Sequence, residues 1–227
     1  MLFALRHPAI LLGLLLGFLI GVIARAALQQ QLASGAGLSL GRRRLRSVGR
    51  ARPAARWGAY LDPYGAVAAV IAGVGWGVRP PARAGRGALG LLAVALGVHG
   101  ALAVVGFAAY KALSGPPVLG HLVHVSDVLH GSLSLGSSGA QIAVGFGMEN
   151  LACGLLALVP IPPLELGVLL WSRLPRTPGA RRVAYHLLEE AWGVAVILVG
   201  LLLPLAGQSP ALLALLDIVG DPLLRLT

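Results

Sequence analysis

Five apolar stretches, each about the length of a membrane-spanning helix, most constrain what this chain can fold into. About 20 predominantly apolar residues cross the roughly 30 Å hydrocarbon core of a bilayer. The chain is 57% hydrophobic and only 11% charged, whereas soluble domains carry about 25% charged residues. These values exclude an ordinary soluble enzyme. They predict an all-α integral membrane protein with five to six transmembrane helices in one multi-pass domain, 1–227. The predicted spans are 8–32, 60–78, 88–110, 139–159 and 183–207.

Two further apolar stretches, 164–171 and 210–226, are shorter or carry charges. We interpret them as re-entrant or interfacial pieces, the second being the candidate for a sixth span. Arg25 lies near the end of the first predicted span, where a long side chain can reach the headgroups.

The positive charge of the chain is concentrated in one acid-free segment, 42–56. The net charge is +10, and seventeen of the eighteen cationic residues are Arg. In a membrane protein such a segment favours a cytoplasmic loop beside anionic headgroups. No RNA-binding motif accompanies it, so we expect no nucleic-acid partner. With five spans, however, the cationic loop residues divide nine to eight between the two sides of the membrane. Only the density of Arg at 42–56 then favours the cytoplasm for that side. The preference for Arg over Lys is typical of GC-rich bacteria, which indicates the bacterial cytoplasmic membrane.

A proline-rich break follows the fourth predicted span. Pro160, Pro162 and Pro163 cannot donate backbone hydrogen bonds, and the acidic Glu165 comes directly after them. The carbonyl groups freed by a broken helix must find partners inside the protein. This segment therefore either lines a functional interior with Glu165 as its carboxylate, or simply ends the helix at the membrane interface.

The segment around this break resembles the site-2 protease family of intramembrane zinc metalloproteases. The family has Asn, an apolar run and then Asn-Leu-x-Pro-x-Pro-Pro-Leu-Asp-Gly, and its Asp binds zinc. Here Asn150 and Glu165 occupy the first Asn and the Asp positions. Three stretches of this chain are similar to family elements: Val159-Pro160-Ile161-Pro162-Pro163-Leu164, Leu61-Asp62-Pro63-Tyr64-Gly65 and Gly75-Trp76-Gly77-Val78-Arg79-Pro80. Leu188-Glu189-Glu190-Ala191-Trp192-Gly193 is more loosely similar to the family's late helix. The resemblance implies a site-2 protease-like core.

The catalytic motif of that family is missing. Its His-Glu-x-x-His places two zinc ligands on one helix face with a general base between them. Counting back from Asp62 puts the motif near residue 20, where Ile20, Gly21 and Ala24 replace the ligands and the base. We therefore expect no catalytic residue, no metal and no cofactor, and interpret the chain as a pseudoprotease.

A non-catalytic member of that family could still bind a membrane segment. Besides the lipid bilayer, the expected partner is a single-pass membrane protein or its transmembrane segment. The resemblance places the contact groove at Asn150, Pro160, Pro162, Pro163 and Asp62.

Two other functions stay open. An active metalloprotease with a rearranged zinc site would use Glu165 with His99, or ligands such as His121, His124 and Asp127 from a cluster that recurs every third residue and also includes His130. A small ion or solute transporter would use Glu149 and Asn150 beside the broken helix. We expect Glu149 to be wet near the end of its helix; if it is buried, Arg25 and His99 are its candidate partners.

Overall fold

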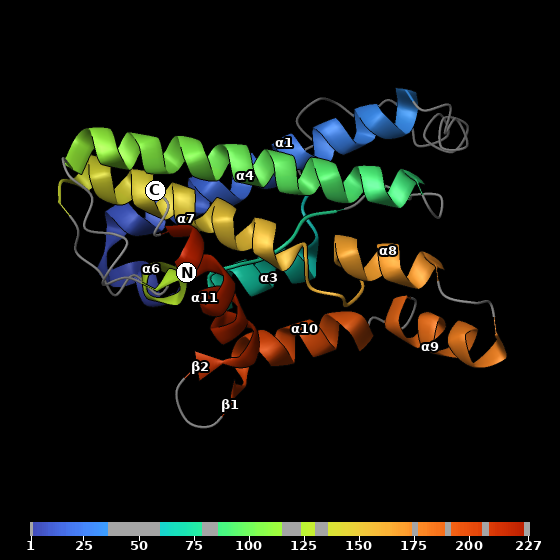
Figure 1. Cartoon of the computed structure of the whole chain (residues 1–227). Helices are drawn as coiled ribbons and strands as arrows, with labels where there is room; N and C mark the ends of the chain where they lie inside the picture. Colours follow the sequence, from blue (N-terminus) through green and yellow to red (C-terminus); the bar gives the residue numbers. More distant parts are fainter. Residues whose placement is uncertain are drawn as a thin grey trace, which may run out of the picture.

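The computed structural model describes residues 2–35, 60–78, 86–114, 124–129, 136–173, 177–188, 192–205 and 209–224. These residues are mainly helical (Figure 1). The helices are η1 (Leu2–Arg6), α1 (Pro8–Gly35), α3 (Pro63–Ala72), α4 (Arg86–Ser114), α6 (Val125–Leu129), α7 (Ser138–Leu156), α8 (Glu165–Arg173), α9 (Pro178–Leu188), α10 (Trp192–Leu202) and α11 (Ala211–Leu224). Two short strands, β1 (Pro204–Leu205) and β2 (Ser209–Pro210), pair antiparallel.

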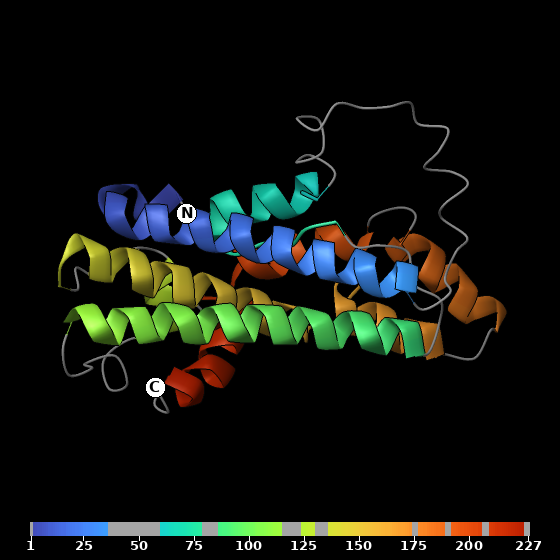
Figure 2. The same ribbon diagram turned by 90° about the horizontal axis from the view of Figure 1, so that it is seen from above.

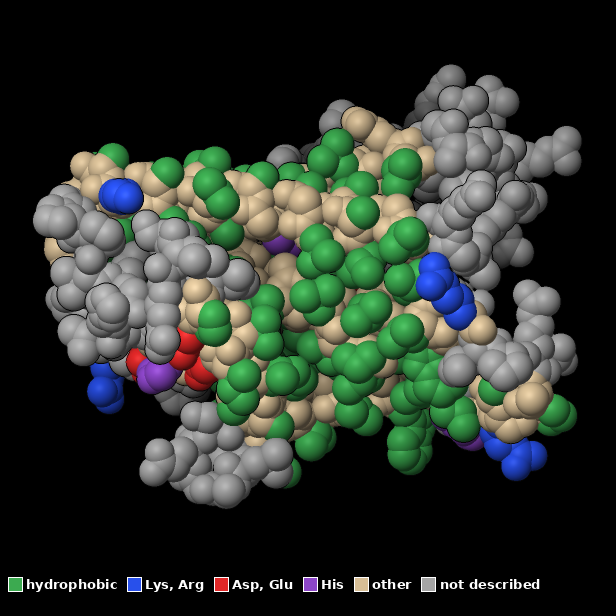
Figure 3. Space-filling model, viewed as in Figure 1, with side chains coloured by type: hydrophobic (Ala, Val, Ile, Leu, Met, Phe, Trp, Pro, Cys, Tyr) green, Lys and Arg blue, Asp and Glu red, His purple; other side chains and the backbone are tan. Residues whose placement is uncertain are grey.

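Helices α1, α7 and α4 lie side by side and form the centre of the molecule (Figure 2). Within the described residues, α1 and α4 are the two single helices long and apolar enough to cross a membrane. A space-filling view shows a broad apolar face with its charged side chains at the two ends (Figure 3). The structure confirms the expectation of a helical protein with helices able to span a membrane. Helices α1 and α4 correspond to the predicted spans 8–32 and 88–110.

Glycines let α7 approach α1 closely. A Cβ atom at Gly13 would overlap the carbonyl oxygen of Ile142, and one at Gly17 would lie 2.9 Å from the carbonyl oxygen of Phe146. Small residues at four-residue spacing line one helix face and let two backbones touch. On the other side of α7, a Cβ at Gly106 of α4 would lie 2.5 Å from Cα of Gly147. The three central helices therefore pack backbone against backbone.

Replacing Gly13 by Ala should weaken the α1–α7 contact, because the added methyl group has no space. Gly97→Ala on α4 is the matched control, since nothing lies within 4 Å of its added Cβ. Alanine is otherwise favoured over glycine in a helix by about 1 kcal/mol. We expect Gly13→Ala to lower the unfolding temperature in detergent and Gly97→Ala to leave it equal or higher. Equal effects of the two substitutions would contradict this packing.

Residues 60–78 do not form the single spanning helix that hydropathy predicts. Helix α3 has ten residues, about 15 Å of length, which is half of a bilayer core. It ends at Gly73, whose φ of 89° is left-handed, a conformation that glycine adopts without strain. The chain then returns in extended form, and Leu61 pairs antiparallel with Gly77. The segment therefore enters and leaves at the same end of the bundle.

The later predicted spans are also divided. The break predicted at the prolines is present, since α7 ends at Leu156 and α8 begins at Glu165. The stretch 183–207 is not one straight helix: α9 and α10 are bent by 59° relative to each other and form one span only as a pair. The stretches 164–171 and 210–226 correspond to the short helices α8 and α11.

Polar contacts join α6 to α11 at the end of the bundle opposite α8. His124 Nδ1 donates to Asp221 Oδ2 at 2.6 Å. The amide and hydroxyl groups of Ser126 donate to the two carboxylate oxygens of Asp217 at 2.8 and 2.7 Å. Asp127 accepts from the amide of His124 at the start of α6. The hydrogen bond and the charge of Asp221 raise the pKa of His124 above its usual 6.5, and the charges of Asp127 and Asp217 add to this shift.

The contact between α6 and α11 should weaken as pH rises. A pKa that is higher in the folded state means that the pair contributes fully below about 6.5 and loses its contribution as pH rises through the folded-state pKa of His124. We expect hydrogen exchange of the α11 amides, corrected for the intrinsic pH dependence, to be faster at mildly alkaline than at mildly acidic pH. His124→Asn should remove this difference. A difference that persists in that variant would assign it to another group.

Candidate functional site

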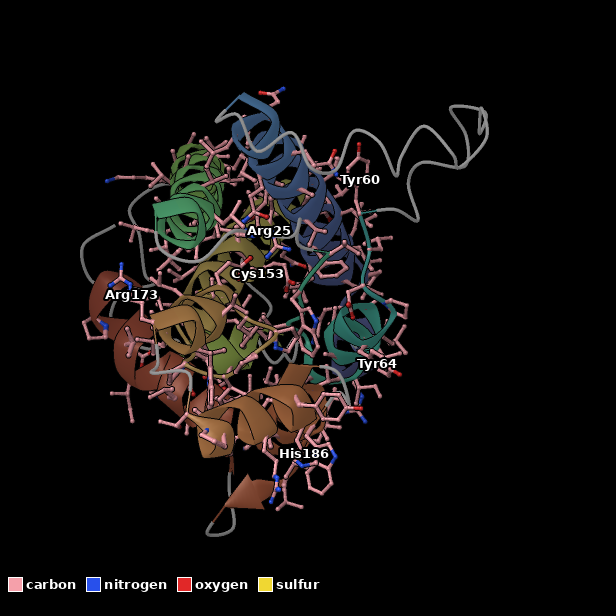
Figure 4. The ribbon with its side chains drawn as sticks, turned by 90° about the vertical axis from the view of Figure 1, so that its right-hand side faces the viewer. Arg25, Tyr60, Tyr64, Cys153, Arg173 and His186 are labelled. Carbon is pink, nitrogen blue, oxygen red and sulfur yellow. The ribbon has the colours of Figure 1, made fainter. Side chains whose placement is uncertain are left out.

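A buried ion pair joins α1 to the start of α8. Arg25 Nη1 donates to Glu165 Oε1 at 2.6 Å, and the two side chains are 4% and 3% exposed. Arg25 Nη2 donates to the carbonyl oxygen of Gly77 at 2.9 Å. One guanidinium group therefore connects α1, the extended return after α3 and the first turn of α8. Figure 4 shows Arg25 pointing into the interior between the helices.

The proline-rich turn positions Glu165 for this contact. The amide of Leu164 donates to the carbonyl of Ile161, and the amide of Leu166 reaches back to the carbonyl of Ala157, each at 3.0 Å. Glu165 is then the first residue of α8. A carboxylate in the first turn of a helix is stabilised by the unpaired amides and the helix dipole. The turn, the dipole and the guanidinium of Arg25 all favour a carboxylate at this place.

A second polar group crosses the bundle one helical turn from Arg25. His99 of α4 hydrogen-bonds Asn150 of α7, with Nδ1 and Oδ1 3.0 Å apart. The amide nitrogen of Asn150 donates to the carbonyl oxygens of Gly17, at 3.3 Å, and of Phe146, at 3.0 Å. A Cβ at Gly21 would lie 2.5 Å from Asn150 Oδ1 and 2.8 Å from the His99 ring. The pair therefore occupies the volume that a side chain at position 21 would need.

Glu149 is fully buried, so the expectation that it is wet is wrong. The thiol of Cys153 donates to Glu149 Oε1 at 3.4 Å and lies 3.5 Å from the carbonyl oxygen of Gly75. Neither Arg25 nor His99 is its hydrogen-bond partner. Within the residues that the structure describes, Glu149 Oε2 has no hydrogen-bond partner. The interior thus holds a second acid that the Arg25 ion pair does not use.

The three positions assigned to the missing catalytic motif do not face the interior together. Ile20 lies on the outer face of α1 and is 44% exposed, and Ala24 is half-buried. The inward pair at helical spacing i, i+4 is instead Gly21 and Arg25. If the alignment with the family motif is shifted by one residue, Gly21 and Arg25 take the positions of the two histidines. Arg25, and not Ala24, is then the residue that contacts Glu165.

The predicted groove residues are mostly enclosed. Asn150 and Pro162 are buried, Pro163 is half-buried and Pro160 is exposed. Asp62 caps α3, because its Oδ1 accepts from the amides of Tyr64 and Gly65 at 2.9 and 3.0 Å. Asp62 is therefore used by the fold, and Pro160 is the member of the set that is exposed.

The alternative metal ligands are not brought together. Glu165 is engaged by Arg25, while His124 and Asp127 lie on or beside α6 at the opposite end of the bundle (Figure 1). His121 and the Arg-rich segment 42–56 lie outside the described residues. Across the described part of the chain, no three His, Cys, Asp or Glu residues are placed to share a metal ion.

The fold and this interior define a helical membrane protein in which one buried ion pair, Arg25–Glu165, joins segments that are distant in the sequence. Comparisons with protein-family models, with curated proteins and with solved structures find no match.

Sequence reasoning missed Arg25 as a member of the site. Its place late in an apolar helix predicts a position at the headgroups, whereas the structure buries it. A signal was present, because Gly13, Gly17, Gly21 and Arg25 recur every four residues and so share the face of α1 that packs closely against the bundle.

Removing the charge of Arg25 alone should be strongly destabilising. Arg25→Met leaves the buried carboxylate of Glu165 without its partner, and breaking such a pair costs about 3–5 kcal/mol. The double variant Arg25→Met, Glu165→Leu should recover most of the loss, because paired buried charges are often replaceable by apolar groups. Thermal unfolding in detergent measures both, with the exposed Arg182→Met as the control. A double variant as unstable as the single one would refute the coupling.

Proposed function

We propose that this chain is a site-2 protease-like membrane protein without a zinc site, which binds or regulates another membrane protein. The observation that carries the proposal is the Arg25–Glu165 ion pair. Glu165 occupies the position that the family resemblance assigns to a zinc ligand. In this chain that carboxylate already has a cationic partner, supplied by the helix that would otherwise carry the metal-binding histidines.

The contacts around the ion pair support the loss of catalysis. A metal ion and a guanidinium group compete for the same carboxylate oxygen, and their like charges repel each other. The space beside Gly21 is filled by His99 and Asn150, so a catalytic glutamate at that position would displace both. A hydrolytic zinc site needs three protein ligands and an open position for water. Arg25 and the His99–Asn150 pair together take the room for such a site.

The partner in this proposal is a single-pass membrane protein or its transmembrane segment. Because Asn150 and Pro162 are buried, the contact lies at the exposed edge of the proline turn, at Leu158 and Pro160. Leu158 is 39% exposed and apolar, as a lipid-immersed contact requires. We place the protein in the bacterial cytoplasmic membrane, with the segment 42–56 on the cytoplasmic side.

Two measurements on the full-length protein test this function. A photo-reactive amino acid at Leu158 should cross-link a single-pass membrane protein in cells, whereas the same group at Val104, which is 64% exposed on α4, should cross-link only lipid. The purified protein should contain no stoichiometric zinc and leave an unfolded transmembrane substrate uncut. Zinc that is lost in Glu165→Ala, or cleavage of the substrate, would establish the metalloprotease instead. Equal cross-linking from both positions would remove the proposed contact.

One observation favours the transporter as the second candidate. Glu149 is a fully buried acid in the middle of α7, with one oxygen that has no partner among the described residues. Ionisable groups buried at membrane depth are typical of ion and proton pathways. The same purified protein in liposomes distinguishes the two functions: a proton or ion flux that disappears in Glu149→Gln would support transport, and the absence of any flux would count against it.

A further inference from the structure

Most of the cationic residues of this chain adjoin, in the sequence, helix ends that lie at one end of the bundle. Helix α1 ends there, α4 begins there and α8 ends there (Figures 1 and 2). Because Leu61 pairs antiparallel with Gly77, both ends of the segment 60–78 face this same end of the bundle. Fourteen of the eighteen cationic residues fall in 36–59, 79–86 and 173–182, the stretches that adjoin these helix ends. With five spans, the cationic residues divide nearly equally between the two sides of the membrane because 60–78 is counted as a membrane crossing.

Helix α9 is the described element that this end presents outward. It packs mainly against α10 and exposes Arg182, Val183 and Tyr185. Tyr185 and Val183 are 55% and 45% exposed, and Trp192, just after α9, is 61% exposed. The exposed Arg173 ends α8 nearby. Figure 4 turns this end toward the viewer and labels Arg173 and His186 on it.

The side chains of this surface have the chemistry of a membrane interface. Residues 173–192 contain four Arg and two acids, Glu189 and Glu190, which leaves a net positive charge. The ring of His186 lies edge-on to the rings of Tyr185 and Trp192, at centroid distances of 5.8 and 6.4 Å. Tyr and Trp concentrate at the headgroup level of bilayers, where their rings are half apolar and half polar. Helices that combine exposed Arg with aromatic and aliphatic side chains lie in the plane of the interface and bind anionic lipid.

We propose that α9 lies in the cytoplasmic headgroup layer and binds anionic phospholipid through Arg173 and Arg182, with Tyr185 and Trp192 inserted beside them. Charge complementarity selects the occupant, because the described residues of this surface include the exposed Arg173 and Arg182 and no acid, and it lies at the end of a membrane bundle, beside lipid phosphate groups. The site is independent of the partner contact at Leu158 and of the Arg25–Glu165 ion pair.

An environment-sensitive fluorophore on α9 tests this binding. The full-length Tyr185→Cys protein, in a Cys153→Ala background, is labelled and reconstituted into nanodiscs of phosphatidylcholine alone or mixed with phosphatidylglycerol. We expect a blue-shifted emission with phosphatidylglycerol, and its reversal at high salt, since the attraction is electrostatic. Arg173→Gln with Arg182→Gln should abolish the shift. Lys111→Gln, at the opposite end of α4, is the matched control and should leave the shift unchanged.

Three results would overturn the proposal. The first is equal emission in the two lipid compositions, and the second is a shift that survives the double Arg variant. The third is a blue shift caused by added RNA and not by anionic lipid, which would assign the basic end to nucleic acid. The substituted arginines are exposed, so the variants should fold. The salt dependence of the emission, measured with both arginines intact, is a second readout that needs no Arg substitution.

Discussion

Arg25 brings a full positive charge into the interior of an apolar bundle, and its contacts determine how the surrounding segments meet. A buried charge is tolerated only when it is paired and hydrogen-bonded. Glu165 supplies the opposite charge from a position 140 residues away, and the carbonyl oxygen of Gly77 supplies the second acceptor. The ends of α1, the α3 hairpin and α8 are therefore fixed together by one side chain. Gln29, one turn further along α1, adds a bond to the carbonyl oxygen of Leu91 on α4.

The polar interior depends on close packing of the helix backbones. Gly13 and Gly17 bring α1 against α7, so Asn150 can reach the carbonyl oxygen of Gly17. A larger residue at either glycine would separate the helices and leave the Asn150 amide without that acceptor. Arg25 lies on the same face of α1 as these glycines, two turns beyond Gly17. Close approach and charge pairing are thus parts of one helix surface, and Arg25, Gln29 and Asn150 each find a backbone carbonyl oxygen within reach.

The sequence predicts best what depends on local composition. The apolar runs that become α1 and α4 were predicted because length and hydropathy suffice for them, and the break at the prolines because proline cannot continue a helix. The span 60–78 was wrong, since hydropathy does not register that Gly73 turns the chain back. Arg25 is expected at the headgroups and Glu149 in water, because the partner of Arg25, Glu165, lies 140 residues away and hydropathy alone does not show that Glu149 is enclosed by the fold. The buried, fold-stabilising role of Asn150 is likewise set by tertiary contacts, whereas Asp62 caps α3 through local ones.

The antiparallel pairing of Leu61 with Gly77 has a consequence for how the protein is made. Because 60–78 returns to the end from which it starts, the chain between α1 and α4 begins and finishes on one side of the bundle. Ten arginines lie between Gly35 and the first turn of α4. When this stretch stays on the side of synthesis, insertion transfers none of these charges through the hydrocarbon, where each would cost about 2.5–3.5 kcal/mol. The return of 60–78 therefore spares the three arginines that follow it, Arg79, Arg83 and Arg86, the passage across the bilayer that a spanning helix at this place would require.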